Sequence, residues 1–466
     1  MKTIIDPPNA LAQGLAAIRA EFLVPESFPP QVLAAAKEAA TRPPTEHADR
    51  TDRHFVTLDP ATSTDLDQAF AIEATGADLL LHYAIADVAW FVRDGDPLDV
   101  EAWKRGETLY LPDGRAGLYP PALSEDAASL LPSGPRPAVI FTVRVAPDGA
   151  VQLDVVERAV IRSRAKLAYD SVREDQLPAG FGELSRRIAA AEAGRGASRV
   201  DPPEQEVARA TDGGYTLAFR PRLVSEDQNA ALSLATNMAV ADALAAHGTG
   251  LFRVMPAPAP PAVQRLRHTA QALALPWPAD QPLDVFERTL DAGAPKHAAF
   301  MLALRRASFG ATYEAFRHGV KPWHAAVAAT YAHATAPLRR LADRYVVQAA
   351  LAVANGRPVP EPVAQAFEKL PAVMARADAI AGRINRAVID LAEAAMLKDR
   401  VGERFAAVVV ASDEDGARIQ LRDVAVAARL PAPGLQPGET VEVQLAAVDP
   451  LKRRATFMLP AVGTGT

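Results

Sequence analysis

The residues best suited to chemistry in this 466-residue chain are three aspartates within nine positions: Asp59, Asp65 and Asp67. Carboxylates so close together repel one another unless a cation lies between them, and an all-oxygen set suits Mg²⁺ or Mn²⁺. A structural interpretation competes, because Asp, Ser and Thr are also common in turns and at helix N-caps. An EF-hand is a poor alternative, since the loop lacks the glycine and the glutamate that this calcium geometry requires.

The segments around the loop favour the metal interpretation, because both are typical of β-strands. Residues 55–58 have strand propensity and lead directly into Asp59. Residues 79–86 form an apolar run that is typical of a buried strand and ends at Asp87. We therefore expect two neighbouring strands to carry acidic side chains to the same rim of a sheet.

Several motifs together resemble the catalytic domain of the ribonuclease II/R exoribonucleases, the RNB family. The acidic loop has the family's spacing of Asp-Pro, four residues, Asp, one residue and Asp, and the strand 82–88 follows it. The further matches occur in the family's order at Pro97–Asp99, Arg105–Gly106, Tyr110–Pro112, Leu118–Pro120, Leu123–Ser124, Arg162–Tyr169 and Tyr331–Asp343. The resemblance covers about residues 28–396. Several motifs in order are stronger evidence than any single one.

The resemblance implies metal-assisted hydrolysis of RNA phosphodiesters, from the 3′ end toward the 5′ end, with release of nucleoside 5′-monophosphates. Asp67 would be the aspartate on which catalysis most depends, with Asp65 as a further catalytic residue. Asp59, Asp65 and Asp67 would hold Mg²⁺, with Mn²⁺ as a possible substitute. Two such ions roughly 4 Å apart activate a water molecule and stabilise the leaving oxygen.

The resemblance also implies which residues contact single-stranded RNA. Tyr110 matches an aromatic position that stacks on bases near the 3′ end, and stacking tolerates any sequence. Arg339 would stabilise transition-state charge from the start of a helix marked by Pro337, with Asp343 orienting it. The expected RNA-binding residues are Tyr110, Arg339, Arg340 and Arg383, and Arg344 and Arg386 are further candidates for a basic lining. Taken singly, each arginine other than Arg339 is better explained as a solvated helix-face charge, because only Arg339 has a motif behind it.

The chain departs from the family pattern at several positions. Gln68 replaces a carboxylate, which lowers the negative charge of the loop, although its amide can still donate an oxygen to a metal. Ile389 stands where the family has a functional glutamate, for which Asp390 or Glu393 could substitute, and Ala336 replaces a serine. The alternatives are therefore a degenerate, catalytically weak or dead RNA-binding member and, less favoured, a DNA exonuclease.

Composition and local patterns indicate an α+β protein: a short helical extension over 1–45, a mixed α/β catalytic domain over 46–400 and a C-terminal β-barrel of the OB type over 401–466. The first helix is expected from Asn9 to Leu23, with Leu11, Leu15, Ile18 and Phe22 on its apolar face. A hairpin is expected from the strands at 138–145 and 151–156 and the turn at 147–149, and the barrel strands are expected at 404–410, 418–421, 440–445 and 454–458. The chain has 49% hydrophobic residues, no cysteine and a formal net charge of −6. Disulfides are thereby excluded, and no stretch is apolar enough to span a membrane. We expect a monomeric cytoplasmic protein whose basic channel is local, because its overall charge is acidic.

Overall fold

The computed structural model describes residues 2–4, 10–197, 204–209, 215–220, 222–291, 294–307, 310–422, 424 and 426–460. Asn9, where the first helix is expected to begin, and residues 461–466 of the expected barrel domain lie outside this part of the chain.

Helices and strands are mixed along the described chain, which confirms the α+β class. The α-helices are α1 (Ala10–Glu21), α2 (Pro30–Ala40), α3 (Val88–Phe91), α4 (Pro97–Arg105), α5 (Phe181–Arg195), α6 (Val224–Ala246), α7 (Pro260–Ala272), α8 (Leu283–Glu287), α9 (Pro295–Ala307), α10 (Leu341–Ala354) and α11 (Glu361–Leu397), with the short helical turns η1 (Leu123–Ala127) and η2 (Glu174–Gln176). The strands up to the barrel are β1 (Lys2–Ile4), β2 (Ala48–Asp49), β3 (Phe55–Asp59), β4 (Gln68–Thr75), β5 (Asp78–Ala86), β6 (Leu109–Leu111), β7 (Gly114–Ala116), β8 (Arg136–Val145), β9 (Val151–Ile161), β10 (Ser163–Ala168), β11 (Glu204–Arg209), β12 (Tyr215–Arg220), β13 (Leu251–Val254) and β14 (Thr312–Ala315).

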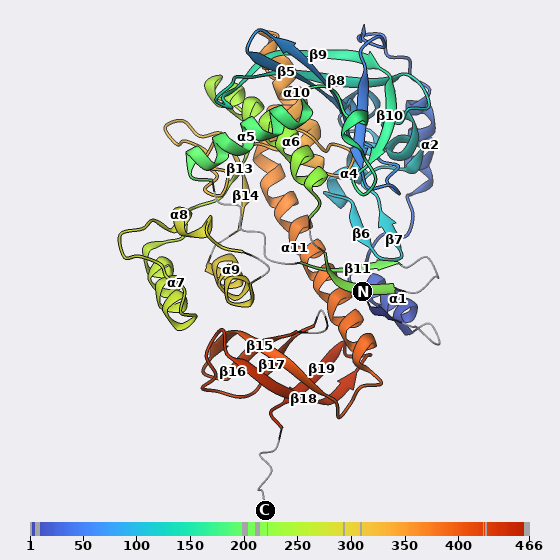
Figure 1. Ribbon diagram of the computed structural model, residues 1–466. Coiled ribbons are helices and arrows are strands. Elements are labelled where there is room, and N and C mark those ends of the chain that lie inside the picture. The colour runs from blue at the N-terminus through green and yellow to red at the C-terminus, as the bar shows by residue number, and fades with distance from the viewer. Residues whose placement is uncertain are drawn as a thin grey trace, which may run out of the picture.

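A seven-stranded sheet, with the order β10-β3-β4-β5-β8-β9-β2, forms the centre of the upper body (Figure 1). The hairpin expected from the apolar run at 138–145 and the turn at 147–149 is present as β8 and β9. Helix α6 packs against β5, β8 and β9, and α10 packs against α6 and β9. The apolar side chains of the sheet therefore lie in one continuous core with these helices.

The expectation that the strands before Asp59 and Asp87 are neighbours is wrong, because β4 lies between β3 and β5. Both strands are antiparallel to β4, so both still end at the same rim. Asp87 is nevertheless engaged elsewhere: it is buried and pairs with Arg158 at 2.8 Å and His47 at 3.1 Å. Asp87 therefore contributes to the structure of this rim, not to the acidic loop.

The 37-residue helix α11 runs from the upper body to the C-terminal barrel (Figure 1). Helix α1 packs along it through the apolar side chains that define its expected helical face, including Leu11, Leu15 and Ile18. The two helices approach closely at Gly14, where an added Cβ would lie 2.5 Å from a side-chain carbon of Leu391.

The C-terminal barrel consists of β15 (Arg404–Asp413), β16 (Gly416–Leu421), β17 (Ala427–Leu430), β18 (Thr440–Asp449) and β19 (Arg454–Met458). The sheet order is β17-β16-β15-β18-β19, and the edge strands β17 and β19 also contact each other. This nearly closed arrangement confirms the expected OB-type fold. Within the barrel, the sequence patterns predicted β15, β16, β18 and β19 but not β17.

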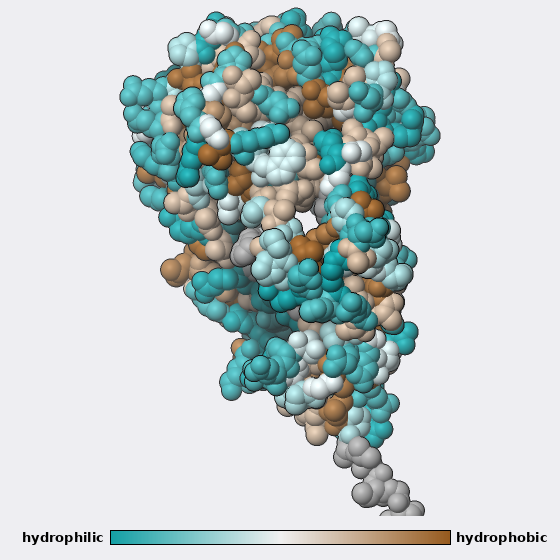
Figure 2. All heavy atoms as spheres, turned by 90° about the vertical axis from the view of Figure 1, so that its left-hand side faces the viewer, coloured by the Kyte–Doolittle hydropathy of each residue, from teal (hydrophilic) through white to brown (hydrophobic). Residues whose placement is uncertain are grey.

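No helix in the described part of the chain is long and apolar enough to cross a membrane. Seen from the left of Figure 1, the surface is mostly hydrophilic, with scattered hydrophobic residues and a hollow between the upper body and the lower part (Figure 2).

Candidate active site

The acidic loop, residues 59–67, connects the end of β3 to the start of β4. Its anchor is Leu66, which is fully buried, and whose backbone N–H donates to Ser129 Oγ at 2.9 Å. Because Asp65 and Asp67 flank this anchor, their positions follow from the burial of one leucine. Tyr169 fixes the other end of the loop, since its N–H donates to the carbonyl of Asp59.

Asp67 contacts a loop that is far away in sequence. The backbone N–H of Leu338 donates to Asp67 Oδ1 at 2.7 Å, and Arg339 Nε lies 3.8 Å from Asp67 Oδ2. Burial raises the pKa of Asp67 well above its usual value, and the positive charge of Arg339 opposes that effect. The structure therefore brings together the two residues expected to matter most, Asp67 and Arg339.

The arginine loop, residues 331–340, precedes α10, so the expectation that Pro337 marks the helix start is wrong. The helix begins at Leu341. Arg339 lies in the preceding turn, where its side chain is 45% exposed and free to reach a ligand. Its backbone carbonyl accepts from Thr108 N–H, which ties the loop to the segment before β6. Arg339 is therefore held by its backbone while its guanidinium faces the acidic loop.

Two other arginines expected at the RNA surface are held in ion pairs within the protein instead. Arg340 makes a two-bond pair with Asp343, at 2.9 and 2.8 Å, and Asp343 also accepts from Ala336 N–H. Asp343 thus orients Arg340 and not Arg339, and Arg340 is not free to bind RNA. Arg344 is buried and pairs with Asp99. Both pairs stabilise the loop and helix that carry Arg339.

Asp65 is held by two residues of the β6–β7 hairpin. The Tyr110 hydroxyl donates to Asp65 Oδ2 at 3.2 Å, and the ring is 54% exposed. Arg115 pairs with Asp65 Oδ1 and with Glu125 at 2.9 Å. The structure therefore places Tyr110 beside the acidic loop, as its proposed stacking role requires.

Arg115 was missed by the sequence interpretation. The available signal was Pro112-Asp113-Gly114, a sequence typical of a tight turn, which folds Arg115 back beside Tyr110. Lys166 lies within the motif at 162–169, for which no individual role was predicted. Its positive charge acts on Asp59, and its Nζ donates to the carbonyl of Ala61.

Of the three aspartates, Asp59 has the carboxylate best placed to hold a cation. Among the described residues, no hydrogen bond or ion pair engages its carboxylate. Burial, with the negative charge of Asp65, raises its pKa to about 7. A buried carboxylate that has no charged or hydrogen-bonding partner is costly in free energy. The Asp59 carboxylate therefore fits a hard divalent cation.

The three aspartates do not converge as a complete ligand set. No group of three or more His, Cys, Asp or Glu side chains in the described ranges is arranged to hold a metal ion. Asp65 is turned toward Arg115 and Tyr110, and one oxygen of Asp67 accepts from Leu338. Carboxylate oxygens are the type of donor that fits Mg²⁺. For all three aspartates to bind the same ions, however, Asp65 would have to give up part of its contact with Arg115.

Gln68 is not oriented as a metal ligand, which corrects that expectation. Its Oε1 accepts a hydrogen bond from the Tyr83 hydroxyl, and its Nε2 donates to the carbonyl of Thr335 at 2.8 Å. Both ends of the amide are therefore occupied. Gln68 links the acidic loop to the arginine loop.

The proposed substitutes for the family's glutamate lie away from these loops. Glu393 is buried and accepts hydrogen bonds from Gln205 Nε2 at 2.6 Å and Ala427 N–H at 2.9 Å. It joins α11 to β11 and β17. Arg383 is exposed on α11, where its guanidinium lies 5.0 Å from the centroid of the Phe22 ring.

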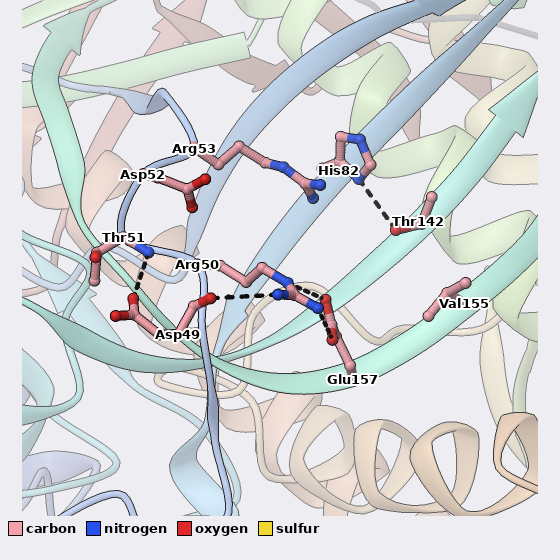
Figure 3. Close-up of a pocket in the computed structure, with 9 residues that line it drawn as sticks. All are labelled: Asp49, Arg50, Thr51, Asp52, Arg53, His82, Thr142, Val155 and Glu157. Carbon is pink, nitrogen blue, oxygen red and sulfur yellow. Dashed lines mark hydrogen bonds and ion pairs between the residues drawn. The ribbon is translucent and has the colours of Figure 1, made fainter.

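A separate polar pocket of about 580 Å³ lies over the sheet, between β5, β8, β9 and residues 49–53 (Figure 3). Arg50 pairs with Glu157 at 2.9 Å, and His82 contacts Thr142 at 3.1 Å. Burial lowers the pKa of His82, which favours the neutral ring. None of the three aspartates lines this pocket, so it is distinct from the candidate active site.

A mixed helix and sheet body, an acidic loop facing an arginine and a C-terminal barrel are the features of the ribonuclease II/R class. The RNB domain model matches residues 48–354, and the model of the RNase II-type exonuclease C-terminal S1 domain matches residues 403–459. The chain belongs to the RNB family.

Individual proteins agree with this assignment. The chain is 27% identical over 435 residues to Ribonuclease R of Aquifex aeolicus, a match that covers 86% of this chain and 61% of that protein. It spans less than two thirds of the length of the ribonuclease R and exoribonuclease 2 relatives that it matches.

Two solved structures share the fold. Ribonuclease R of Mycoplasma genitalium, in complex with ribose-methylated single-stranded RNA, superposes with a TM-score of 0.87 at 21% identity, covering 97% of this chain and 78% of that one. Yeast Ssd1, described as a pseudonuclease, superposes with a TM-score of 0.71 at 15% identity, covering 97% of this chain and 58% of that one. The fold thus occurs in both a ribonuclease and a pseudonuclease.

Proposed function

We propose that the protein is an exoribonuclease that hydrolyses single-stranded RNA from the 3′ end and releases nucleoside 5′-monophosphates. The observation that carries the proposal is the contact between the acidic loop and the arginine loop through Asp67, Leu338 and Arg339. This contact places a carboxylate and a guanidinium at one point, as charge stabilisation at a phosphodiester requires. Membership of the RNB family supports the same reaction.

Within this proposal, Asp59, Asp65 and Asp67 hold Mg²⁺, or Mn²⁺ in its place. The ions would supply an activated water and charge neutralisation at the leaving oxygen, by the two-metal chemistry of many nucleases. The unpartnered carboxylate of Asp59 and its raised pKa support this assignment.

The side chains around the acidic loop have distinct roles in the proposed reaction. Arg339 binds the scissile phosphate and stabilises the charge that develops on it. Tyr110 stacks on a base close to Asp65, which limits how the 3′ nucleotide can rotate. Gln68 keeps the arginine loop against the acidic loop through Thr335. Arg115 offsets the charge of Asp65 before substrate binds.

A second candidate function is RNA binding without turnover. Two observations favour it: Gln68 is committed to hydrogen bonds within the protein, and no complete carboxylate cluster is formed in the described residues. In this case the RNA-binding surfaces persist while hydrolysis is lost.

A digest of oligo(A) separates the two candidates. RNA labelled at its 5′ end is incubated with the full chain and Mg²⁺, with and without EDTA, and a matched oligo(dA) is included. The proposal predicts a ladder that shortens from the 3′ end, only with RNA and only without EDTA. Intact RNA together with a measurable gel shift would favour the second candidate, and equal cleavage of oligo(dA) would reject RNA specificity.

A further inference from the structure

A groove of about 500 Å³ lies outside the acidic and arginine loops, where α1, α11 and the β18–β19 turn meet. One wall is a single ridge of α11, because Asp378, Gly382, Arg386 and Asp390 follow one another at four-residue spacing. At 1.5 Å per residue this ridge is about 18 Å long. The opposite side comes from Phe22 and from the turn at 452–453. We call this feature the α11 groove.

The upper end of the groove adjoins the candidate active site. Gly106, next to the β6–β7 hairpin, lies so close to α11 that an added Cβ would be 2.8 Å from Ala377 Cβ. The following residue, Glu107, forms a β-bridge with Arg340 of the arginine loop. Asp378, one position beyond Ala377, lines the groove. Asp378 also pairs with Arg253, whose backbone N–H donates to the carbonyl of Tyr331 in the arginine loop, so the upper end of the α11 groove lies near that loop.

Two exposed arginines contribute positive charge to the groove. Among the described residues, neither Arg383 nor Arg386 makes an ion pair. Lys452, on the opposite side, is exposed and only 3.6 Å from Asp449, a contact worth little in water.

The acidic residues of the groove are mostly compensated. Glu21 pairs with Arg453 at 2.7 Å, and Asp378 pairs with Arg253 at 3.1 Å. Asp390 is partly buried, and burial raises its pKa against the opposing charges of Arg386, Arg418 and Arg453. The charge left available in the groove is thus positive, unlike the net charge of the chain.

An aromatic ring lies beside these cations. Phe22 follows the last turn of α1, is only partly buried, and has the Arg383 guanidinium 5.0 Å from its ring centroid. An aromatic face combined with adjacent cations is the arrangement that binds single-stranded nucleic acid without sequence preference. The neighbouring apolar cluster of α1 and α11 keeps this ring in place.

We propose that the α11 groove binds the single-stranded RNA segment upstream of the nucleotides in the active site, with a base stacked on the Phe22–Arg383 pair and phosphates on Arg386 and Lys452. This inference rests on the proposed function for its choice of ligand. It adds a binding surface built in part from the N-terminal helix, which lies outside the matched RNB domain.

The test uses the full chain and two conservative variants, Phe22→Leu and Arg386→Gln. Leucine retains apolar packing but has no π-face, and glutamine removes the positive charge while keeping a polar end that can form hydrogen bonds. The control is Arg376→Gln, because Arg376 is an exposed arginine of α11 that does not line the groove. Thermal melting of each variant establishes that it is folded.

The first readout is equilibrium binding of a fluorescent oligo(A) 20-mer, measured by anisotropy. EDTA is present so that the RNA is not hydrolysed during the measurement. We expect each groove variant to bind about tenfold more weakly and the Arg376→Gln control to bind like the unmodified chain. Arg386→Gln should also reduce the slope of log affinity against log salt concentration by about 1. Unchanged affinity in both groove variants would overturn the inference.

The second readout is hydrolysis, and it separates failure of the groove from failure of the proposed function. If the unmodified chain degrades RNA, the groove variants should raise KM for the 20-mer about tenfold and leave cleavage of a trinucleotide unchanged. Equal losses on both substrates would contradict an upstream site. If the chain binds but cleaves nothing, the proposed function fails while the anisotropy result still decides the groove.

Discussion

The backbone N–H of Leu338 donates to the carboxylate of Asp67 at 2.7 Å, across 271 residues of sequence. This hydrogen bond joins the acidic loop, which precedes β4, to the arginine loop, which precedes α10. Asp67 is only 6% exposed, so the contact is also protected from water. The acid and the arginine of the candidate site are therefore parts of one folded unit, and several predictions depend on that unit.

Substitution Asp67→Asn should abolish RNA hydrolysis and leave RNA binding intact. Asparagine preserves an oxygen that can accept from Leu338 N–H, but it removes the charge needed beside Arg339. We expect kcat to fall at least about a hundredfold, in line with the loss of a positioned charged group at a reaction centre. Initial rates on oligo(A) with anisotropy on the same RNA measure both effects. Undiminished hydrolysis would show that Asp67 is not the essential carboxylate.

Substitution Gln68→Glu should destabilise the protein, although it is nearly isosteric. The new carboxylate can accept from Tyr83, but it cannot donate to the carbonyl of Thr335, which it would then repel. The expected loss in free energy of unfolding is about 2 kcal/mol, typical of a partly buried polar group left unsatisfied. Urea denaturation at pH 8 measures this loss. The control is Gln365→Glu on the exposed face of α11, which should change stability by less than about 0.5 kcal/mol.

The stability of the barrel junction should depend on pH through Glu393. Burial raises the pKa of this carboxyl to about 7, above its usual value of 4.5. The folded state therefore holds the proton more tightly than the unfolded chain, and stability falls as pH rises from about 4.5 to about 7. Glu393→Gln removes this titration, so the variant should gain about 2 kcal/mol over the unmodified chain at pH 8 and little at pH 5. Melting curves at both pH values provide the comparison, and an equal effect at both would contradict the prediction.

The requirement for Mg²⁺ should itself depend on pH, because Asp59 must lose its proton to bind a cation. Burial and Asp65 raise the pKa of Asp59 to about 7, so the concentration of Mg²⁺ that gives half-maximal activity should fall as pH rises from 6 to 8. Titrations of initial rate with Mg²⁺ at pH 6, 7 and 8 measure this. The same half-maximal concentration at all three values would argue against Asp59 as a ligand.

The sequence predicted those parts of the fold that depend on local pattern. The strand before Asp59, the hairpin of β8 and β9 and the apolar face of α1 all follow from periodicity and turn residues over fewer than 25 positions. Strand β17 was missed because it has only four residues and its pairing with β16 is decided by the closure of the barrel.

The roles of individual arginines could not be predicted in the same way. Arg339 and Arg340 are adjacent in sequence, yet one is exposed and the other is paired with Asp343. The turn after Pro337 sets the different directions of these two side chains, because α10 begins only at Leu341. The two hydrogen bonds of Gln68 likewise depend on partners 15 and 267 residues away, so no local pattern reveals them.

Release of AMP from oligo(A) by the full chain is the decisive measurement of the proposed activity. Products are separated by chromatography after incubation with Mg²⁺, with EDTA, and with Mg²⁺ and the Asp67→Asn variant. We expect steady production of AMP by the unmodified chain with Mg²⁺ and none in the other two reactions. Absence of AMP in the first reaction, while the same preparation still binds the RNA, would contradict it.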